Sequence, residues 1–73
     1  MRMGRSAEQV TTTLKEIRMN ADVTQEELAE KVGVSRQTII SIEKGNYLPS
    51  IALSLKLARY FNVTVEDIFA YEG

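Results

Sequence analysis

Cysteine and histidine are both absent from this sequence of 73 residues. Their absence rules out a disulfide framework and every Cys/His metal site. It also removes the side chains that most often serve as base or nucleophile near neutral pH, and no glycine-rich phosphate loop is visible. The sequence therefore predicts no catalytic residue, no metal, no cofactor and no enzymatic activity. Packing alone must stabilise a chain near the lower size limit for one hydrophobic core.

Long apolar runs and low-complexity segments are also missing. No run approaches the roughly 18 to 20 residues that a membrane span needs, and Met1 to Gln9 hold no apolar stretch of the signal-peptide kind. We expect a cytoplasmic protein with no membrane partner and no small-molecule ligand. The expected organisation is one domain over residues 10–73 after a flexible arm over residues 1–9. Arg2 and Arg5 of that arm are candidate phosphate contacts, although a frayed terminus is the simpler interpretation.

The chain has little net charge, −1 at pH 7. The acid is concentrated, because residues 21–30 carry four carboxylates and no cation, whereas residues 31–48 carry three cations and one carboxylate. A basic face can therefore exist elsewhere on the molecule, and composition alone neither supports nor excludes a nucleic-acid partner.

Cap and turn residues separate five short helical segments. A capping box, in which Thr24 accepts from the backbone of Glu27 while the glutamate side chain reaches back, opens the second segment. The other start and stop signals are Gly33, Ser35, Gly45-Asn46, Ser50, Asn62 and Thr64. The fourth segment carries an apolar stripe that we expect to lie in the core. That stripe comprises Ile51, Leu53, Leu55, Leu57, Ala58 and Phe61.

These segments predict an all-α fold, a compact five-helix bundle. Each helix is too short to be stable alone, so each must pack against the others. Two stretches favour strands instead: Val10 to Thr13, and the tail from Phe69 through Glu72. We expect these stretches either to pair with each other or to supply a dimer surface through Tyr71 and Phe69.

The stretch from Gln25 to Lys44 has the pattern of two short helices joined by a tight turn. Ala29 is small enough to let the second helix cross closely over the first, and Gly33 relieves the backbone at the corner. Ile39 and Ile42, three residues apart, pin the second helix to the core. Their inward position turns Gln37, Ile40, Ser41 and Lys44 outward at about 100° per residue.

The outward side chains of this second helix suit the reading of bases in a DNA major groove. Arg36 and Gln37 lie in the first turn, where such a helix presents side chains to base edges. Arginine can pair in a bidentate manner with guanine, and glutamine with adenine. Ile40, unusual on a solvated surface, can meet a thymine methyl group, and Ser41 can reach a base edge or a phosphate.

The segment from Thr24 to Gly45, TQEELAEKVGVSRQTIISIEKG, resembles the phage repressor/Cro-type helix-turn-helix family of prokaryotic transcriptional regulators. The similarity continues through Pro49-Ser50 and from Phe61 to Phe69, so it covers roughly residues 14 to 69. It implies a lambda repressor-like fold, a double-stranded DNA partner and a role as a small regulator, typically a repressor. Because one such chain offers one recognition helix, we expect a homodimer on an inverted-repeat operator.

The resemblance also implies roles for individual residues. The residues expected to contact bases are Arg36, Gln37, Ser41 and Ile40. The residues expected to contact phosphates are Gln25, Ser35, Lys44, Asn46 and Tyr47. Arg18 is expected to pair with Glu43 as a structural ion pair, and the helical wheel agrees, because it turns Glu43 toward the buried side.

Two other functions stay open. The same fold serves as a protein-interaction module, such as an antitoxin whose main activity is to bind a partner protein. The acidic residues Glu26, Glu27 and Glu30 form either a solvated face or a surface for such a partner. A single-stranded nucleic-acid binder is disfavoured, because Tyr47 is the only aromatic residue near the expected DNA face.

Overall fold

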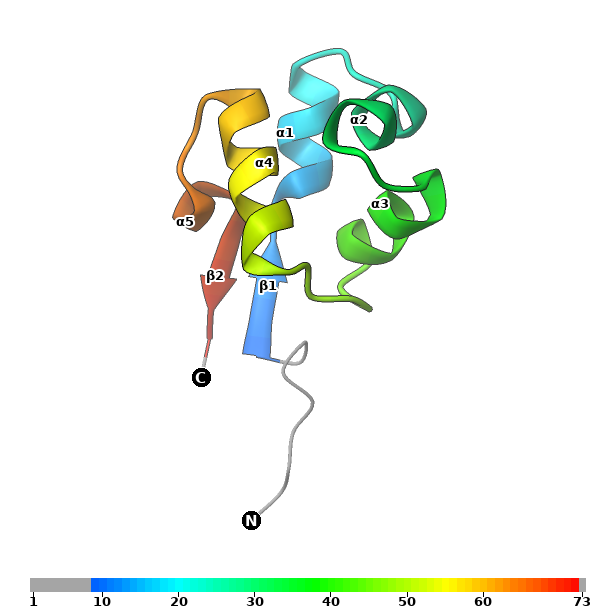
Figure 1. Cartoon of the computed structure of the whole chain (residues 1–73). Coiled ribbons are helices and arrows are strands. Elements are labelled where there is room, and N and C mark those ends of the chain that lie inside the picture. Colours follow the sequence, from blue (N-terminus) through cyan, green and yellow to red (C-terminus); the bar gives the residue numbers. More distant parts are fainter. Residues whose placement is uncertain (1–8, 73) are drawn as a thin grey trace.

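The computed structural model describes residues 9–72, which form five helices and a small two-stranded sheet (Figure 1). In chain order the elements are β1 (Val10–Thr12), α1 (Leu14–Asn20), α2 (Gln25–Val32), α3 (Arg36–Glu43), α4 (Ile51–Phe61), α5 (Val65–Ile68) and β2 (Phe69–Tyr71). The predicted all-α class is therefore confirmed, with the sheet as a minor addition. No helix within the described part of the chain is long and apolar enough to cross a membrane. The predicted arm, with Arg2 and Arg5, lies almost wholly outside the described residues.

The helix ends confirm the cap residues predicted from the sequence. At α2, Thr24 Oγ1 accepts from Glu27 N at 3.0 Å and Thr24 N donates to Glu27 Oε1 at 2.9 Å, which completes the capping box. The hydroxyls of Ser35, Ser50 and Thr64 also accept from a backbone N–H three residues later at the starts of α3, α4 and α5, and only the last of these is a second capping box. These bonds satisfy backbone donors that a helix leaves without partners.

Every helix contributes to one core. The largest fully buried side chains are Leu14, Leu28, Ile39, Ile42, Leu57 and Ile68. They come from α1, α2, α3, α3, α4 and α5 in that order, so each short helix is held by contacts with the others. The core therefore fixes the position of α3 through its contacts with α1 and α2 as well as through its turn.

The structure corrects the expected core stripe of α4. Leu53, Leu57 and Ala58 are buried and Phe61 packs at the edge of the core, but the side chains of Ile51 and Leu55 are 80% and 57% exposed. At 100° per residue these last two lie on a flank of the helix, away from the direction set by the buried residues. Apolar content alone does not give that direction.

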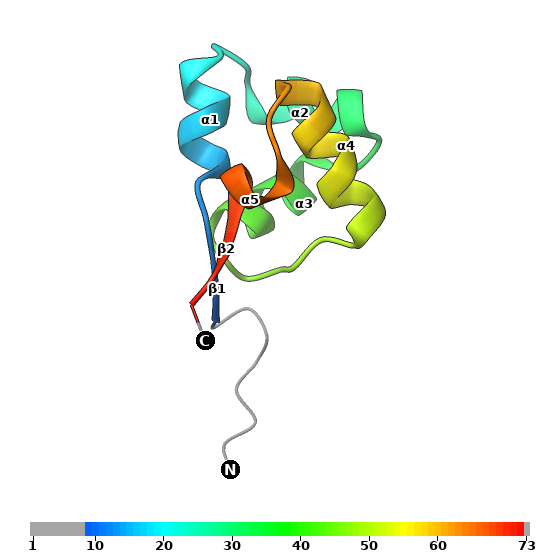
Figure 2. The same ribbon diagram turned by 90° about the vertical axis from the view of Figure 1, so that its left-hand side faces the viewer.

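The strands β1 and β2 pair with each other in antiparallel register, with Val10 opposite Tyr71 and Thr12 opposite Phe69 (Figure 2). Of the two roles expected for these stretches, pairing within the chain is the one observed. Phe69 is half-buried and packs against the core. Glu72 N donates to Gln9 O at 2.5 Å beyond the last sheet pair. The sheet therefore joins the two ends of the described chain.

Candidate nucleic-acid interface

The turn between α2 and α3 fixes how α3 is presented. Gly33 takes the left-handed conformation with φ 79°, as the sequence predicts. The backbone N–H groups of Gly33 and Val34 both donate to Ala29 O, at 2.9 and 3.0 Å. Ala29 is 3% exposed, which agrees with a close crossing of the two helices at this point. The chain then enters α3 at Ser35, whose hydroxyl accepts from Thr38 N at 3.2 Å.

The first turn of α3 projects into solvent. Ile39 and Ile42 are buried, and Arg36 and Gln37 are exposed, as the helical pattern predicts. Ile40, which the helical pattern turns outward, is half-buried rather than exposed.

Five of the predicted DNA-contacting residues lie around one open hollow of about 400 Å³ at the outer side of α3. Its lining residues are Ser35, Gln37, Thr38, Ser41, Asn46 and Tyr47. Asn46 N donates to Ser41 O at 2.9 Å, so the loop after α3 is tied to the helix. The sequence analysis did not select Thr38, whose hydroxyl lies 3.0 Å from that of Ser35. The signal for it was its position three residues after Ser35, which places the two side chains on the same side of the helix start.

A second open hollow, of about 800 Å³, adjoins the other side of the α3 N-terminus. It holds the remaining base-contact candidate of the first turn, Arg36, together with Gln25 at the start of α2. Lys15 of α1 also lines it, and the sequence analysis did not select this residue. The signal for Lys15 was only its positive charge on an exposed helix, which does not reveal that α1 borders α3.

Lys44 lies apart from both hollows. It lines a smaller one, of about 330 Å³, between the end of α3 and β1, together with Thr11 and Thr12. The structure therefore does not bring all the predicted phosphate contacts together. Lys44 stands at the opposite end of α3 from Arg36.

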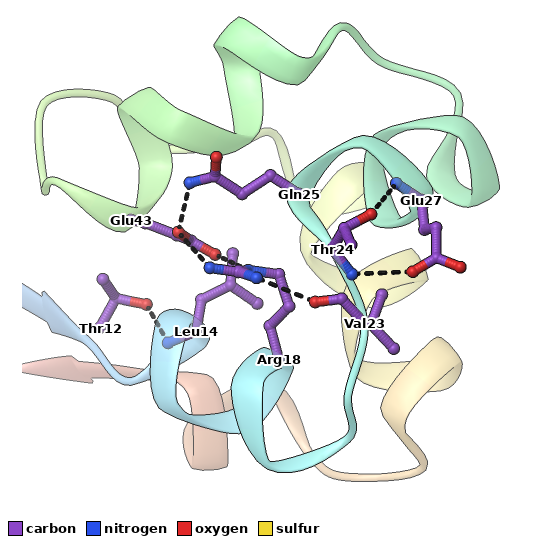
Figure 3. A network of polar contacts seen from close by, with 8 residues as sticks. All are labelled: Thr12, Leu14, Arg18, Val23, Thr24, Gln25, Glu27 and Glu43. Carbon is purple, nitrogen blue, oxygen red and sulfur yellow. Dashed lines mark hydrogen bonds and ion pairs between the residues drawn. The ribbon is translucent and has the colours of Figure 1, made fainter.

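A polar network centred on Glu43 links three helices (Figure 3). Arg18 Nε donates to Glu43 Oε2 at 2.6 Å, and Arg18 Nη2 donates to Glu43 Oε1 at 3.3 Å. Arg18 Nη1 donates to Val23 O at 2.9 Å, in the loop before α2. The two side chains are 11% and 4% exposed. The structure thus contains the ion pair between α1 and α3 and satisfies its charges with hydrogen bonds.

Gln25 belongs to the same network, which the sequence did not reveal. Its Nε2 donates to Glu43 Oε1 at 3.0 Å, so the carboxylate binds two partners from two other helices. This bond uses one of the two amide hydrogens of Gln25. A side-chain partner 18 positions away depends on how the helices pack, which periodicity does not show.

The described residues contain no group of three acidic, histidine or cysteine side chains that could hold a metal ion. Every side-chain nitrogen and oxygen buried within residues 9–72 has a hydrogen-bond partner. Two open hollows flank the N-terminal half of α3. The one with Arg36 is lined by charged side chains of both signs and by the Gln25 amide, and the one with Gln37 is lined by hydroxyl and amide groups.

Comparisons with known proteins give a consistent result. The helix-turn-helix family model HTH_3 matches residues 14–68. A protein of Methanocaldococcus jannaschii named as an HTH-type transcriptional regulator is 59% identical over 59 residues, which cover 81% of this chain and 89% of that protein. Five of the seven matching curated relatives carry the same kind of name.

Solved structures resemble the chain in fold as well. The SOS-response transcriptional repressor LexA of Eubacterium rectale has a TM-score of 0.71 and 33% identity, covering 84% of this chain and 61% of that one. The restriction-modification controller protein C.AhdI of Aeromonas hydrophila has a TM-score of 0.69 and 30% identity, covering 74% and 82%.

Proposed function

The chain belongs to the HTH_3 helix-turn-helix family and is a transcriptional regulator with the DNA-binding fold of that family, and from this premise we propose that it represses transcription as a homodimer on an inverted-repeat operator. Members of the family are DNA-binding regulators rather than enzymes. The observation that carries the proposal is the grouping of Ser35, Gln37, Ser41, Asn46 and Tyr47 around one hollow beside α3.

We assign base reading to the N-terminal half of α3. Arg36 and Gln37 are the exposed side chains of its first turn, one on each side of the helix end, so each can reach a different base pair. Ser41 follows one turn later on the face of Gln37. Ile40 is half-buried, which leaves only part of its side chain for a thymine methyl group.

Phosphate contacts would orient the duplex on this helix. Ser35, Asn46 and Tyr47 border the Gln37 hollow, and Gln25 borders the Arg36 hollow, so the candidate contacts flank α3 on both sides. Such contacts position a protein without reading sequence. Lys44 would contact the backbone farther along, near β1.

Repression and dimerisation are the finer parts of the proposal. One short recognition helix makes too few base contacts for high specificity, and two helices about one DNA turn apart would double them. The likeness to a protein named as a transcriptional repressor supports repression. A regulator of this kind would act in the cytoplasm of a prokaryotic cell, where the DNA is.

The proposal is tested by fluorescence anisotropy with duplex DNA from the region upstream of the protein's own gene, beside an unrelated duplex, at several salt concentrations. We expect tight, salt-dependent binding to the first duplex and weak binding to the second. The variant Arg36→Ala/Gln37→Ala should bind the two duplexes with similar affinity. Each bidentate contact between a side chain and a base contributes about 1–3 kcal/mol of discrimination between bases.

The matched control is Lys56→Ala, which removes an exposed cation of α4 that borders neither of the two hollows. It should keep the discrimination and the affinity. Equal and weak binding of the wild type to both duplexes, unchanged in the double variant, would contradict the proposal for this operator. In that case the exposed acidic residues Glu26, Glu27 and Glu30 would direct attention to a protein partner.

A further inference from the structure

Three cations gather where the end of α2 meets the second half of α4. Lys31, Lys56 and Arg59 line one open hollow of about 420 Å³, which Tyr60 also borders. All three cations are exposed. In the described part of the chain the salt-bridged cation is Arg18, so no described carboxylate forms a salt bridge with any of the three. We call Lys31, Lys56, Arg59 and Tyr60 the basic patch.

The patch depends on the direction in which α4 turns its polar residues. Lys56 and Arg59 are three positions apart and Tyr60 comes four positions after Lys56, so these side chains are neighbours on one side of the helix. The helix contains no acidic residue. Its opposite side is fixed by the core, in which Leu57 is fully buried. Lys31, from the last turn of α2, adds a third cation to the same hollow.

Tyr60 gives the patch an apolar surface and a hydrogen-bond donor. The residue is 39% exposed, and its ring meets that of Phe61 edge to face, with the centroids 4.9 Å apart and the planes at 84°. Such a contact is a favourable geometry for two aromatic rings and holds the Tyr60 ring in place. Its phenolic hydroxyl can donate to a carboxylate. The patch therefore combines positive charge, aromatic surface and a neutral donor.

We propose that the basic patch binds an acidic segment of another protein. Lysine and arginine side chains form charge-assisted hydrogen bonds with carboxylates, and clusters of such cations are a recurring mode of recognition for acidic motifs. The Tyr60 ring would pack against an apolar side chain placed among the acidic ones. This inference goes beyond the proposed function, because Lys31, Lys56 and Arg59 border neither of the two hollows beside α3.

The patch lies apart from the candidate DNA-binding face. The loop that carries Asn46 and Tyr47 leads into the start of α4, and the helix then runs away from that loop (Figures 1 and 2). At about 1.5 Å per residue, Lys56 and Arg59 lie roughly 8 and 12 Å along the helix axis from Ile51. A protein segment bound at the patch would therefore leave the recognition helix free for DNA.

The surroundings favour a protein over a nucleic acid as the occupant. Glu30 lines the same hollow, and Glu27 stands one helical turn before Lys31. A phosphate backbone carries charge of one sign only and would be repelled by these carboxylates. A protein segment can offer donors to Glu30 as well as carboxylates to the cations. Single-stranded nucleic acids also need several aromatic side chains for successive bases, and this hollow holds only Tyr60.

A second copy of the chain fits the patch poorly. Residues 21–30 carry four carboxylates and no cation, so they are the acidic stretch that a second copy would offer. Two of them, Asp22 and Glu26, line the hollow that holds Arg36. A copy that docked in this way would cover a residue proposed to read bases and would bring Arg36 toward the cations of the patch. A different protein meets neither obstacle.

The test is fluorescence anisotropy with a short labelled peptide in which aspartate and glutamate alternate with leucine and phenylalanine. A second peptide has asparagine and glutamine in place of the acids. The wild type should bind the acidic peptide about tenfold more tightly than the neutral one, and added salt should weaken this binding. Lys56→Gln/Arg59→Gln should weaken it by about fivefold or more, because each exposed ion pair contributes only modestly. Lys15→Gln/Lys44→Gln, which changes the net charge equally, should bind as the wild type does.

Several results would overturn the proposal. Equal affinity of the wild type for both peptides is one, and an equal loss in the two double variants is another, because binding would then reflect net charge alone. Tighter binding of single-stranded oligothymidylate that Lys56→Gln/Arg59→Gln abolishes would assign the patch to nucleic acid. Without peptide, a difference in sedimentation between the wild type and this variant would assign it to a second copy. Circular dichroism establishes that the variants are folded.

The location of binding is measured by amide chemical shifts of the labelled protein. The acidic peptide should shift the signals of Lys31, Arg59 and Tyr60 and leave that of Arg36 unchanged. A saturating amount of duplex DNA from the region upstream of the gene should not displace the peptide. Shifts centred on Arg36, or displacement of the peptide by the duplex, would place the peptide on the candidate DNA-binding face and contradict the inference.

Discussion

Glu43 places a negative charge on the helix that we propose to read DNA, and its surroundings explain why this charge does not repel a phosphate. Its side chain is 4% exposed and binds Arg18 and Gln25 at once. The charge is balanced inside the bundle, and the pair holds α1 and the start of α2 against the end of α3. Glu43 is therefore a structural residue, although it lies on the helix that we propose to read DNA.

Replacement of Glu43 by alanine should destabilise the fold. The change leaves the buried guanidinium of Arg18 without a counter-charge, which typically lowers the free energy of unfolding by about 3 to 5 kcal/mol. Thermal denaturation followed by circular dichroism measures the effect. The control is Arg18→Met/Glu43→Leu, which removes both charges and should lose less. An unchanged thermal midpoint in Glu43→Ala would refute the structural role.

A second prediction at this scale separates phosphate contact from base contact. Lys44→Ala should weaken binding to every duplex by a similar factor and reduce the slope of log affinity against log salt by about 0.9, the value for one lost phosphate contact. Lys56→Ala should leave that slope unchanged. The same slope in both variants would show that Lys44 does not contact the DNA. This test matters most for Lys44, because it lies beside β1 and apart from the other proposed phosphate contacts.

Single residues were predictable from the sequence where the cause is local. Thr24, Ser35, Ser50 and Thr64 cap helices because the hydroxyl and the backbone N–H it accepts from are three residues apart. The bond of Gln25 to Glu43 and the place of Lys15 beside Arg36 were not predictable in this way. They depend on which helices meet, and three-dimensional packing decides that.

Among the elements, α2 depends most directly on one local motif. The capping box binds its first turn, and the bonds from Thr24, first through its backbone amide and then through its side chain, hold the pKa of Glu27 below its ordinary value of 4.5. Lys31 lowers this pKa further, while desolvation opposes the shift. A lowered pKa in the folded state means that ionised Glu27 favours folding.

The pH dependence follows from that sign. Because the folded-state pKa is depressed, the contribution of Glu27 is fully present above 4.5 and is lost as the pH falls through the lower folded value. We expect Glu27→Gln to reduce stability at neutral pH and to differ less from the wild type as acid is added. Urea denaturation over a series of pH values measures both curves. A difference that does not change with pH would show that the charge of Glu27 plays no part.

The α4 helix shows what the sequence leaves undetermined about an element. Its limits and caps follow from Ser50 and Asn62, the latter in the left-handed conformation with φ 57° that the sequence predicts for a helix end. Its orientation does not follow, because six apolar residues cover more of the helix than one core contact can bury. Packing buries the side with Leu53 and Leu57 and leaves Ile51 and Leu55 outside.

At the scale of the whole molecule, the sheet closes the bundle. β2 follows α5 without a break, and Thr13 N donates to Ile68 O at 2.9 Å, so the start of α1 is bound to the end of α5. Removal of residues 69–73 would take away the partner of β1 and the packing of Phe69. The five-helix arrangement is predictable from the sequence, whereas the choice between a sheet within the chain and one between chains is not.

That truncation should lower the free energy of unfolding by about 2 kcal/mol or more, because it removes a partly buried aromatic side chain and three cross-strand pairs. The measurement is chemical denaturation of the full chain and of residues 1–68. Tyr71→Ala, which alters a mostly exposed side chain of β2, is the control and should have a smaller effect. A truncated chain as stable as the full one would show that the helices alone hold the fold.

The same sheet has a consequence for the order of folding. Its partners Val10 and Tyr71 lie at opposite ends of the described chain, whereas α2 and α3 are neighbours along it. The entropy of loop closure therefore favours formation of the helix-turn-helix first and of the sheet last. Contacts that form after the transition state govern how fast a protein opens rather than how fast it folds. The two short strands would then act mainly on the lifetime of the native state, while the speed of folding is set by the helix-turn-helix.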